Sequence, residues 1–189
     1  LEHGVLLEDV AFTHGQHTRT YHFYQSRREQ LGPKPLVLLL HGGGATIDNH
    51  IGVRGARWSQ QVWIDIAEEE GVHVAVPQGL DNHWNDCRAD CSHCGEQDDV
   101  GFLTALIDEI DRRYDVDRGR VYVVGESNGG YMTQRLAQER PELFAGMGVV
   151  ISLMPADNKC QQRDAPIPIT YQVGTADSGV KYEGGSRGN

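Results

Sequence analysis

The sequence lacks several features that would place the protein in a specialised class. No apolar run in its 189 residues approaches the ~20 residues of a membrane-spanning helix, so we expect no membrane partner. Lys and Arg form no cluster, and the formal net charge is −10 with neutral histidines. Because phosphate binding requires a basic surface, nucleic acid is not an expected partner. The first residues do not resemble a signal peptide, and no repeat or low-complexity segment occurs.

Cysteine is scarce, and three of the four cysteines lie within eight residues, as Cys87, Cys91 and Cys94, with Cys160 far along the chain. Two disulfides in an exported protein are the favoured interpretation, which predicts a secreted or periplasmic location. Free buried thiols are one alternative. A zinc site is another, disfavoured because the paired Cys-x2-Cys spacing is not repeated, so we predict no metal centre. The sequence does not choose among the three possible disulfide pairings.

Strands and helices alternate along the chain, which is typical of an α/β fold with a mostly parallel central sheet and helices on both faces. Residues 36–40 form a continuous apolar run, as in a strand that is covered on both sides. At this length we expect a single domain over residues 1–189. The pattern predicts a hairpin over 5–12 and 19–24, and strands at 36–40, 72–76, 120–124, 144–151 and 167–173. It also predicts helices at about 57–70, from 98–99 to about 114, and from the end of the 120–124 strand to about 139.

The most informative stretch is Val121–Met132, in which four β-prone residues lead directly into Gly125-Glu-Ser-Asn-Gly129. A helix-compatible segment follows. The order of strand, Gly-x-Ser-x-Gly and helix is that of a nucleophile elbow, a sharp turn that holds a serine hydroxyl above the end of a strand. The pentapeptide alone is weak evidence because the chain contains 23 glycines. Its context favours Ser127 as a nucleophile for acyl transfer over an ordinary glycine-rich turn.

A second motif, His41-Gly-Gly-Gly44, follows the apolar run. Glycines at the carboxyl end of a strand leave backbone N–H groups free to face a developing oxyanion. We expect Gly43 and Gly44 to form an oxyanion hole with the N–H of Asn128, the residue after the serine. A tight strand-to-loop turn is the alternative role for these glycines. His41 lies on this loop and is interpreted as a structural residue, not as the base.

The acid of the predicted catalytic triad is Asp177, which follows a predicted strand downstream of the serine, in the chain order Ser, Asp, His. Asp157 and Asp164 are alternatives, but neither directly follows a strand. The base is missing, because all nine histidines lie at or before position 93. The simplest hypothesis is that the chain lacks a C-terminal part with further secondary structure and the catalytic histidine.

Several stretches together resemble the poly(3-hydroxybutyrate) depolymerase and feruloyl esterase type of α/β-hydrolase. They are Leu38–Gly44, His83–Asn85, Asp98–Phe102, Val121–Met132, Gly174–Asp177 and Tyr182–Gly185. The resemblance implies a secreted serine esterase that needs no cofactor, with Ser127 as nucleophile and Asp177 as acid. The chain departs from the pattern at Val173, where this family often has histidine, and in the absent catalytic histidine.

The sequence therefore predicts hydrolysis of a small-molecule or polymeric ester through an acyl-enzyme on Ser127. It does not select among feruloyl, acetyl, short-chain and polyhydroxyalkanoate esters, and it does not indicate an oligomeric state. The alternatives are a non-catalytic hydrolase-like protein that binds ester or glycan ligands, and a serine peptidase on the same fold. Trp84 is a candidate for the substrate pocket, with a buried loop anchor as its alternative. We expect Asp98 and Asp99 to cap the helix that they begin and to hold the adjacent loop in place.

Overall fold

The computed structural model describes residues 4–29, 32–55, 59–86, 88–89, 91–155, 158–160 and 165–184. Within these residues, seven strands form one sheet in the order β1-β2-β4-β3-β5-β6-β7. The five neighbouring strands β4, β3, β5, β6 and β7 are parallel. Strand β2 pairs antiparallel with both β4 and β1, and its pairing with β1 confirms the predicted N-terminal hairpin. The strand bounds are β1 Val5–His14, β2 His17–Gln25, β3 Lys34–Leu40, β4 His73–Pro77, β5 Val116–Glu126, β6 Gly146–Val150 and β7 Ile169–Gln172.

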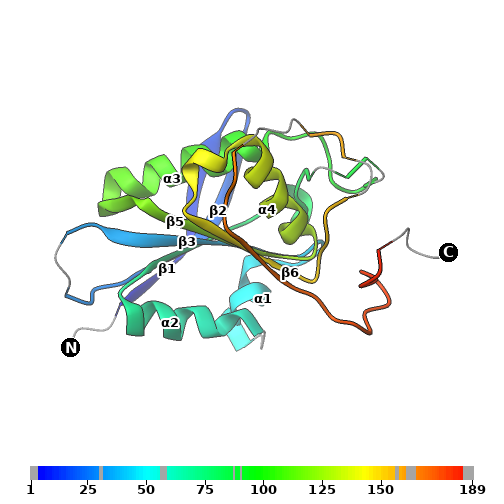
Figure 1. Ribbon diagram of the computed structural model, residues 1–189. Helices are drawn as coiled ribbons and strands as arrows, with labels where there is room; N and C mark the ends of the chain where they lie inside the picture. Colours follow the sequence, from blue (N-terminus) through cyan, green and yellow to red (C-terminus); the bar gives the residue numbers. More distant parts are fainter. Residues whose placement is uncertain are drawn as a thin grey trace.

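Helices lie on both faces of this sheet, as predicted (Figure 1). Helices α3 and α4 cover one face, and α1 and α2 cover the other. Their bounds are α1 Ile47–Ile51, α2 Val62–Glu70, α3 Asp99–Tyr114 and α4 Asn128–Glu139, with 3₁₀ turns at Val53–Gly55, Ser59–Gln61, Leu80–Asn82 and Pro141–Leu143. In the part of the chain that the structure describes, no helix has the length and apolar character required to cross a bilayer.

The region between β3 and β4 differs from the prediction. The helix expected from about residue 57 begins at Val62, after a 3₁₀ turn, and residues 56–58 lie outside the described residues. Helix α1 was not predicted. It has only five residues, too few for a periodic apolar pattern, and is delimited by the Thr46 side chain, which accepts from the Asn49 N–H, and by Gly52 in the left-handed conformation.

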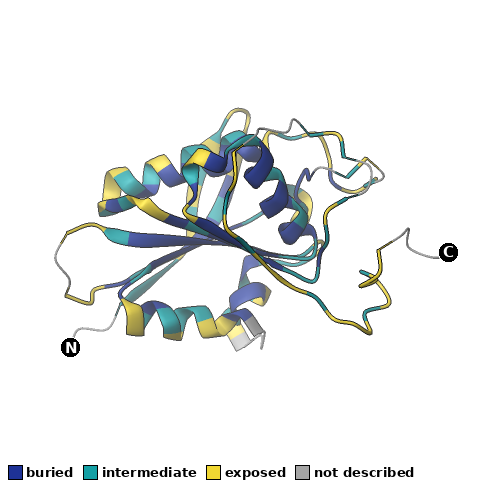
Figure 2. Ribbon diagram, in the orientation of Figure 1, coloured by how far each residue is buried: buried dark blue, intermediate teal, exposed yellow. Residues whose placement is uncertain are grey.

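Strand β3 is at the centre of the core and is buried on both sides (Figure 2). Leu36, Leu38 and Leu40 pack into the cluster that includes residues of α3 and α4, whereas Val37 and Leu39 pack into the cluster formed with α1 and α2. Burial of each such side chain contributes about 1.5–3 kcal/mol. The continuous apolar run was therefore correctly interpreted as a doubly covered strand, and it fixes the position of the loop that follows it.

Strand β7 forms the edge of the described sheet and is the most exposed of the parallel strands. Ile169 is half-buried, but Thr170, Tyr171 and Gln172 are exposed. Within the described residues its only ladder partner is β6. The segment that carries Asp177 therefore follows the outermost of the parallel strands, two positions from β5 in the sheet.

The long loop between β4 and α3 contains a disulfide between Cys91 and Cys94, which confirms that these cysteines form a disulfide. Two sulfurs that are bonded to each other are not thiolate ligands for zinc. Cys160 is also disulfide-bonded, and the described residues include no free cysteine. Cys87, the fourth cysteine, lies outside the described residues. The alternative of free buried thiols is thus wrong for Cys91, Cys94 and Cys160.

These disulfides predict the thiol content of the protein. Under denaturing but non-reducing conditions, titration with a chromogenic disulfide reagent should detect less than one free thiol per chain. After complete reduction, the same titration should detect all four cysteines. Two or more free thiols before reduction would contradict the disulfide assignment.

Candidate active site

Ser127 occupies the turn between β5 and α4, as the Gly-x-Ser-x-Gly pattern predicted. Its backbone has φ 51° and ψ −115°, a conformation that non-glycine residues rarely adopt. The Ser127 N–H donates to the Val150 carbonyl at the end of β6, at an N···O distance of 2.9 Å. The strained turn is thus held by the neighbouring strand.

The two glycines of the pattern are required by close backbone contacts. A Cβ atom at Gly125 would lie 2.1 Å from the Gly129 carbonyl oxygen, and one at Gly129 would lie 2.1 Å from the Leu40 carbonyl oxygen. Both distances are far below van der Waals contact. The first glycine therefore permits the turn to fold back on itself, and the second permits α4 to approach the end of β3.

The loop after β3 lies against this elbow. A Cβ atom at Gly42 would lie 3.5 Å from Ser127 Cβ, and one at Gly43 would lie 3.5 Å from Asn128 Cβ. Gly44 donates its N–H to the Asn82 carbonyl at 2.8 Å, so this group is engaged within the protein. Within the described part of the chain the Gly43 N–H has no such partner. The geometry therefore favours Gly43 over Gly44 as the donor that this loop offers to a ligand.

His41 fixes the conformation of the same loop. Its Nδ1–H donates to the Gly42 carbonyl at 2.8 Å, and its Nε2 accepts from the Gly79 N–H at 2.9 Å. Burial lowers the pKa of His41 to about 4, so the ring is neutral near pH 7. Because both ring nitrogens are engaged inside the protein, His41 is a structural residue, in agreement with the sequence interpretation.

The buried histidines predict a loss of stability in mild acid. Burial also lowers the pKa of His50, to about 3, whereas an unfolded histidine has a pKa near 6.5. Below pH 6.5 the unfolded chain therefore binds more protons than the folded protein, and the free energy of unfolding falls with pH. Between pH 7.5 and 5.0 we expect a loss of about 2 kcal/mol for each of His41 and His50, at 1.36 kcal/mol per pH unit below 6.5.

Urea denaturation at pH 7.5, 6.0 and 5.0 measures this effect, with pH 8.5 as the control in which histidine titration contributes no change. An unfolding free energy that stays constant from pH 7.5 to 5.0 would show that the imidazoles are not buried in the neutral form.

Trp84 is a buried anchor, and the structure does not support the pocket role that we considered for it. The residue has no solvent-exposed surface, and its indole Nε1–H donates to the His41 carbonyl at 3.0 Å. The indole and the His41 imidazole are in contact, with ring centroids 5.1 Å apart. Trp84 thus joins the β4–α3 loop to the loop after β3 and leaves no face for a substrate.

Asp98 and Asp99 have the structural roles that we expected. The Asp98 side chain caps α3 by accepting from the Gly101 N–H at 2.8 Å. Asp99 is fully buried, pairs with Arg19, and accepts from the Asn85 N–H at 2.6 Å. Burial raises the pKa of Asp99, and the Arg19 guanidinium opposes that shift. Both residues therefore fix the start of α3 and its preceding loop.

Asp177 follows β7, as predicted, and is partly buried. Its Oδ1 accepts from the N–H groups of Gly179 at 2.7 Å and Val180 at 2.9 Å, which shapes the turn after the strand. Asp157 and Asp164, the alternative acids, lie outside the described residues. Within the described part of the chain, no hydrogen bond joins a histidine to Ser127. The described residues thus place Ser127 at the elbow without a hydrogen-bonded histidine beside it.

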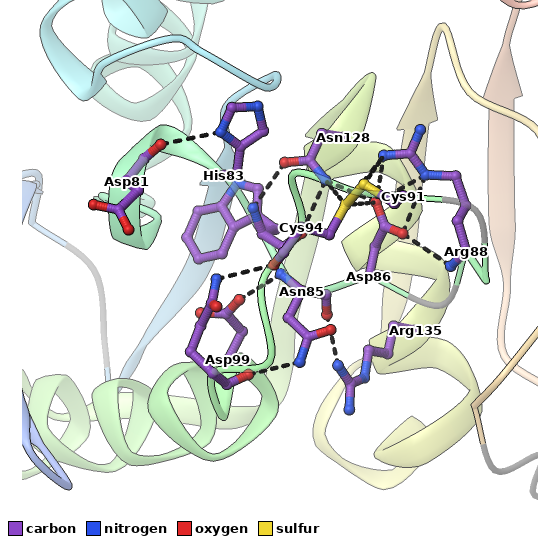
Figure 3. Close-up of a disulfide and its surroundings, with 12 residues drawn as sticks. Asp81, His83, Asn85, Asp86, Arg88, Cys91, Cys94, Asp99, Asn128 and Arg135 are labelled. Carbon is purple, nitrogen blue, oxygen red and sulfur yellow. Dashed lines mark hydrogen bonds and ion pairs between the residues drawn. A yellow bond between two sulfur atoms is a disulfide. The ribbon is translucent and has the colours of Figure 1, made fainter.

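The role of the Asn128 side chain was missed in the sequence, where only its N–H drew attention. Asn128 Oδ1 accepts from the Trp84 N–H at 2.8 Å, and its Nδ2 donates to the Trp84 carbonyl at 3.0 Å. The same Nδ2 donates to Asp86 Oδ2 at 2.7 Å (Figure 3). No local pattern indicates this contact, because 42 positions separate Asp86 from Asn128.

A mostly parallel sheet with helices on both faces and a strained serine between a central strand and its following helix define an α/β-hydrolase. The chain belongs to the prolyl oligopeptidase family, whose model matches residues 81–184.

Relatives and solved structures agree with this assignment. The chain is 30% identical to a poly(3-hydroxybutyrate) depolymerase of Ralstonia pickettii, over 69% of this chain and 28% of the relative. It is 29% identical to feruloyl esterase B of Neurospora crassa, over 69% of this chain and 43% of the relative. The crystal structure of a thermostable esterase matches with a TM-score of 0.58 and 27% identity, over 75% of this chain and 40% of that chain. The predicted resemblance is confirmed, and this chain spans less than half the length of each of these proteins.

Proposed function

We propose that the protein is a serine esterase that hydrolyses carboxylic esters through an acyl-enzyme on Ser127. The observation that carries this proposal is the strained Ser127 backbone with the glycine loop after β3 packed directly against it. An elbow of this kind presents a serine hydroxyl beside backbone donors, which is the arrangement that acyl transfer requires. The names of the relatives, esterase and depolymerase, support an ester as the substrate.

In the proposed reaction the Ser127 hydroxyl oxygen attacks the ester carbonyl carbon, and its proton passes to a base. The N–H groups of Gly43 and Asn128 would stabilise the negative charge that develops on the carbonyl oxygen. The base returns the proton to the departing alcohol as the carbon–oxygen bond breaks. Water, activated by the same base, then releases the acid and restores the serine.

The base would be a histidine outside residues 1–189, because no histidine in the described part of the chain is hydrogen-bonded to Ser127. His41 uses both ring nitrogens within the protein, whereas His83 donates from Nδ1 to the Asp81 carbonyl at 3.0 Å and uses only that nitrogen. Asp177 would accept from the imidazole and orient it. The disulfides support a secreted or periplasmic location, because cystines persist in oxidising compartments.

A panel of substrates tests the proposal with the full-length protein and its Ser127→Ala variant. The panel contains p-nitrophenyl acetate, methyl ferulate, acetylated xylan, poly(3-hydroxybutyrate) and a proline-containing peptide, because the family description names peptidases. Hydrolysis of at least one ester that is lost in the variant would support the proposal. Cleavage of the peptide alone would support the peptidase alternative, and no turnover of any substrate would support a binding role.

A further inference from the structure

Asp86 is a buried carboxylate next to the candidate site that the proposed reaction does not use. Its side chain has no exposed surface and lies in the loop between β4 and α3. It accepts from Arg88 Nη2 at 2.8 Å and Nε at 3.1 Å, and from Asn128 Nδ2 at 2.7 Å. Removing a charge from water is costly even when it is paired, so an ion pair buried here is weak evidence for a purely stabilising role.

The carboxylate determines how the Asn128 carboxamide is oriented. An ionised carboxylate only accepts hydrogen bonds, so the Nδ2 end of the Asn128 amide must face Asp86. The Oδ1 end must then face the Trp84 N–H, from which it accepts at 2.8 Å. Asn128 is 4% exposed, so its carboxamide has little room for another arrangement.

The orientation of this side chain bears directly on the elbow, because Asn128 is the first residue of α4 and follows Ser127. Its carboxamide binds both the N–H and the carbonyl of Trp84. Trp84 in turn donates to the His41 carbonyl, at the start of the loop that holds Gly43. One chain of contacts therefore joins the two backbone N–H groups that would receive the oxyanion.

The rest of the cluster covers these contacts, and Asp86 and Cys94 have no exposed surface. The Cys91–Cys94 disulfide packs on it, with Cys94 Sγ 3.6 Å from Asn128 Nδ2 (Figure 3). The Arg88 guanidinium donates to Cys91 Sγ at 3.3 Å and lies 4.1 Å from the centroid of the Tyr131 ring on α4. In such an enclosed setting a hydrogen bond to a charged acceptor is stronger than in water.

We propose that Asp86 is a positioning residue for the esterase reaction, which holds the Asn128 N–H at its place in the oxyanion hole by orienting the Asn128 carboxamide. The inference rests on the proposed function. It assigns to Asp86 an effect on the transition state, where the oxyanion develops, and not on binding of the neutral ester.

The test compares Asp86→Ala, Asn128→Ala and the double variant in the full-length protein, with rates expressed per folded molecule. Each single variant should lower kcat by ~10-fold or more, since loss of a whole oxyanion donor costs 10²- to 10³-fold, while KM changes less than ~3-fold. The inhibition constant of a trifluoromethyl ketone, which forms a tetrahedral adduct with the serine, should rise by a similar factor. The double variant should lose no more than either single variant, because both act through one contact.

Asp99→Asn is the matched control, because Asp99 is also a fully buried carboxylate that pairs with an arginine and contacts the same loop. It should lower the unfolding temperature but leave kcat per folded molecule within ~2-fold. If Asp86→Ala does not fold, Asp86→Asn replaces it, and its expected loss in kcat is ~3-fold or more.

Three outcomes would overturn the positioning role: unchanged kcat in the Asp86 variants, an equal loss in Asp99→Asn, or additive losses in the double variant. A wild-type protein that neither hydrolyses an ester nor reacts with a fluorophosphonate at Ser127 would overturn the proposed function together with this role. Normal wild-type activity with unaffected Asp86 variants would overturn this role alone.

Discussion

Replacing Ser127 with alanine in the full-length protein should lower kcat for ester hydrolysis by about a millionfold, the loss found when the nucleophile of a serine protease is removed. The variant keeps the backbone of the elbow but has no oxygen to attack the carbonyl. Alanine is smaller than serine and introduces no contact, so the unfolding temperature should change little. Initial rates with p-nitrophenyl acetate measure the first effect, and thermal unfolding measures the second.

Ser92→Ala is the matched control, since Ser92 is an exposed serine in the loop between β4 and α3. It should hydrolyse the ester at the wild-type rate. If Ser127→Ala retains more than about one hundredth of the wild-type kcat while remaining folded, another group is the nucleophile and the assignment of the elbow is wrong.

Residues 1–189 alone should hydrolyse p-nitrophenyl acetate at least ~10³-fold more slowly than a longer chain that supplies the missing histidine. In the shorter chain we expect only the oxyanion donors and substrate binding to contribute, because no described histidine is hydrogen-bonded to Ser127. In the longer chain the rate should depend on a group that titrates near neutral pH. The comparison requires equal concentrations of folded protein and initial rates from pH 5 to 9.

An ordinary esterase rate from residues 1–189 would contradict this prediction. It would mean that one of the nine histidines, or another group, acts as the base. Substitution of His83, the half-buried histidine beside Gly43, would then be the first experiment, because a Cβ atom at Gly43 would lie 3.1 Å from His83 Nε2.

The sequence was sufficient for those parts of the molecule that depend on local patterns. The elbow follows from glycines at positions where a Cβ atom would lie only 2.1 Å from a backbone carbonyl oxygen, and β3 follows from a run of residues buried on both sides. The helix α3 has both an apolar stripe and a capping aspartate, so its start at Asp99 was predicted closely. Each of these signals lies within a few residues of the feature that it specifies.

The features that could not be predicted depend on contacts between distant segments. The engaged N–H of Gly44 depends on a carbonyl at Asn82, and the burial of Trp84 depends on His41 and Asn128. A tryptophan in a long loop is equally compatible with a substrate pocket and with a buried anchor. Only the tertiary arrangement distinguishes the two, and here it favours the anchor.

Reaction with a fluorophosphonate probe, followed by peptide mapping, tests the central claim most directly. The probe forms a covalent bond with an activated serine, so it reports the nucleophile without requiring the natural ester. In the full-length protein we predict a single modified residue, Ser127, and no labelling of the Ser127→Ala variant. Labelling that persists in that variant, or a modified serine elsewhere in the chain, would contradict the account.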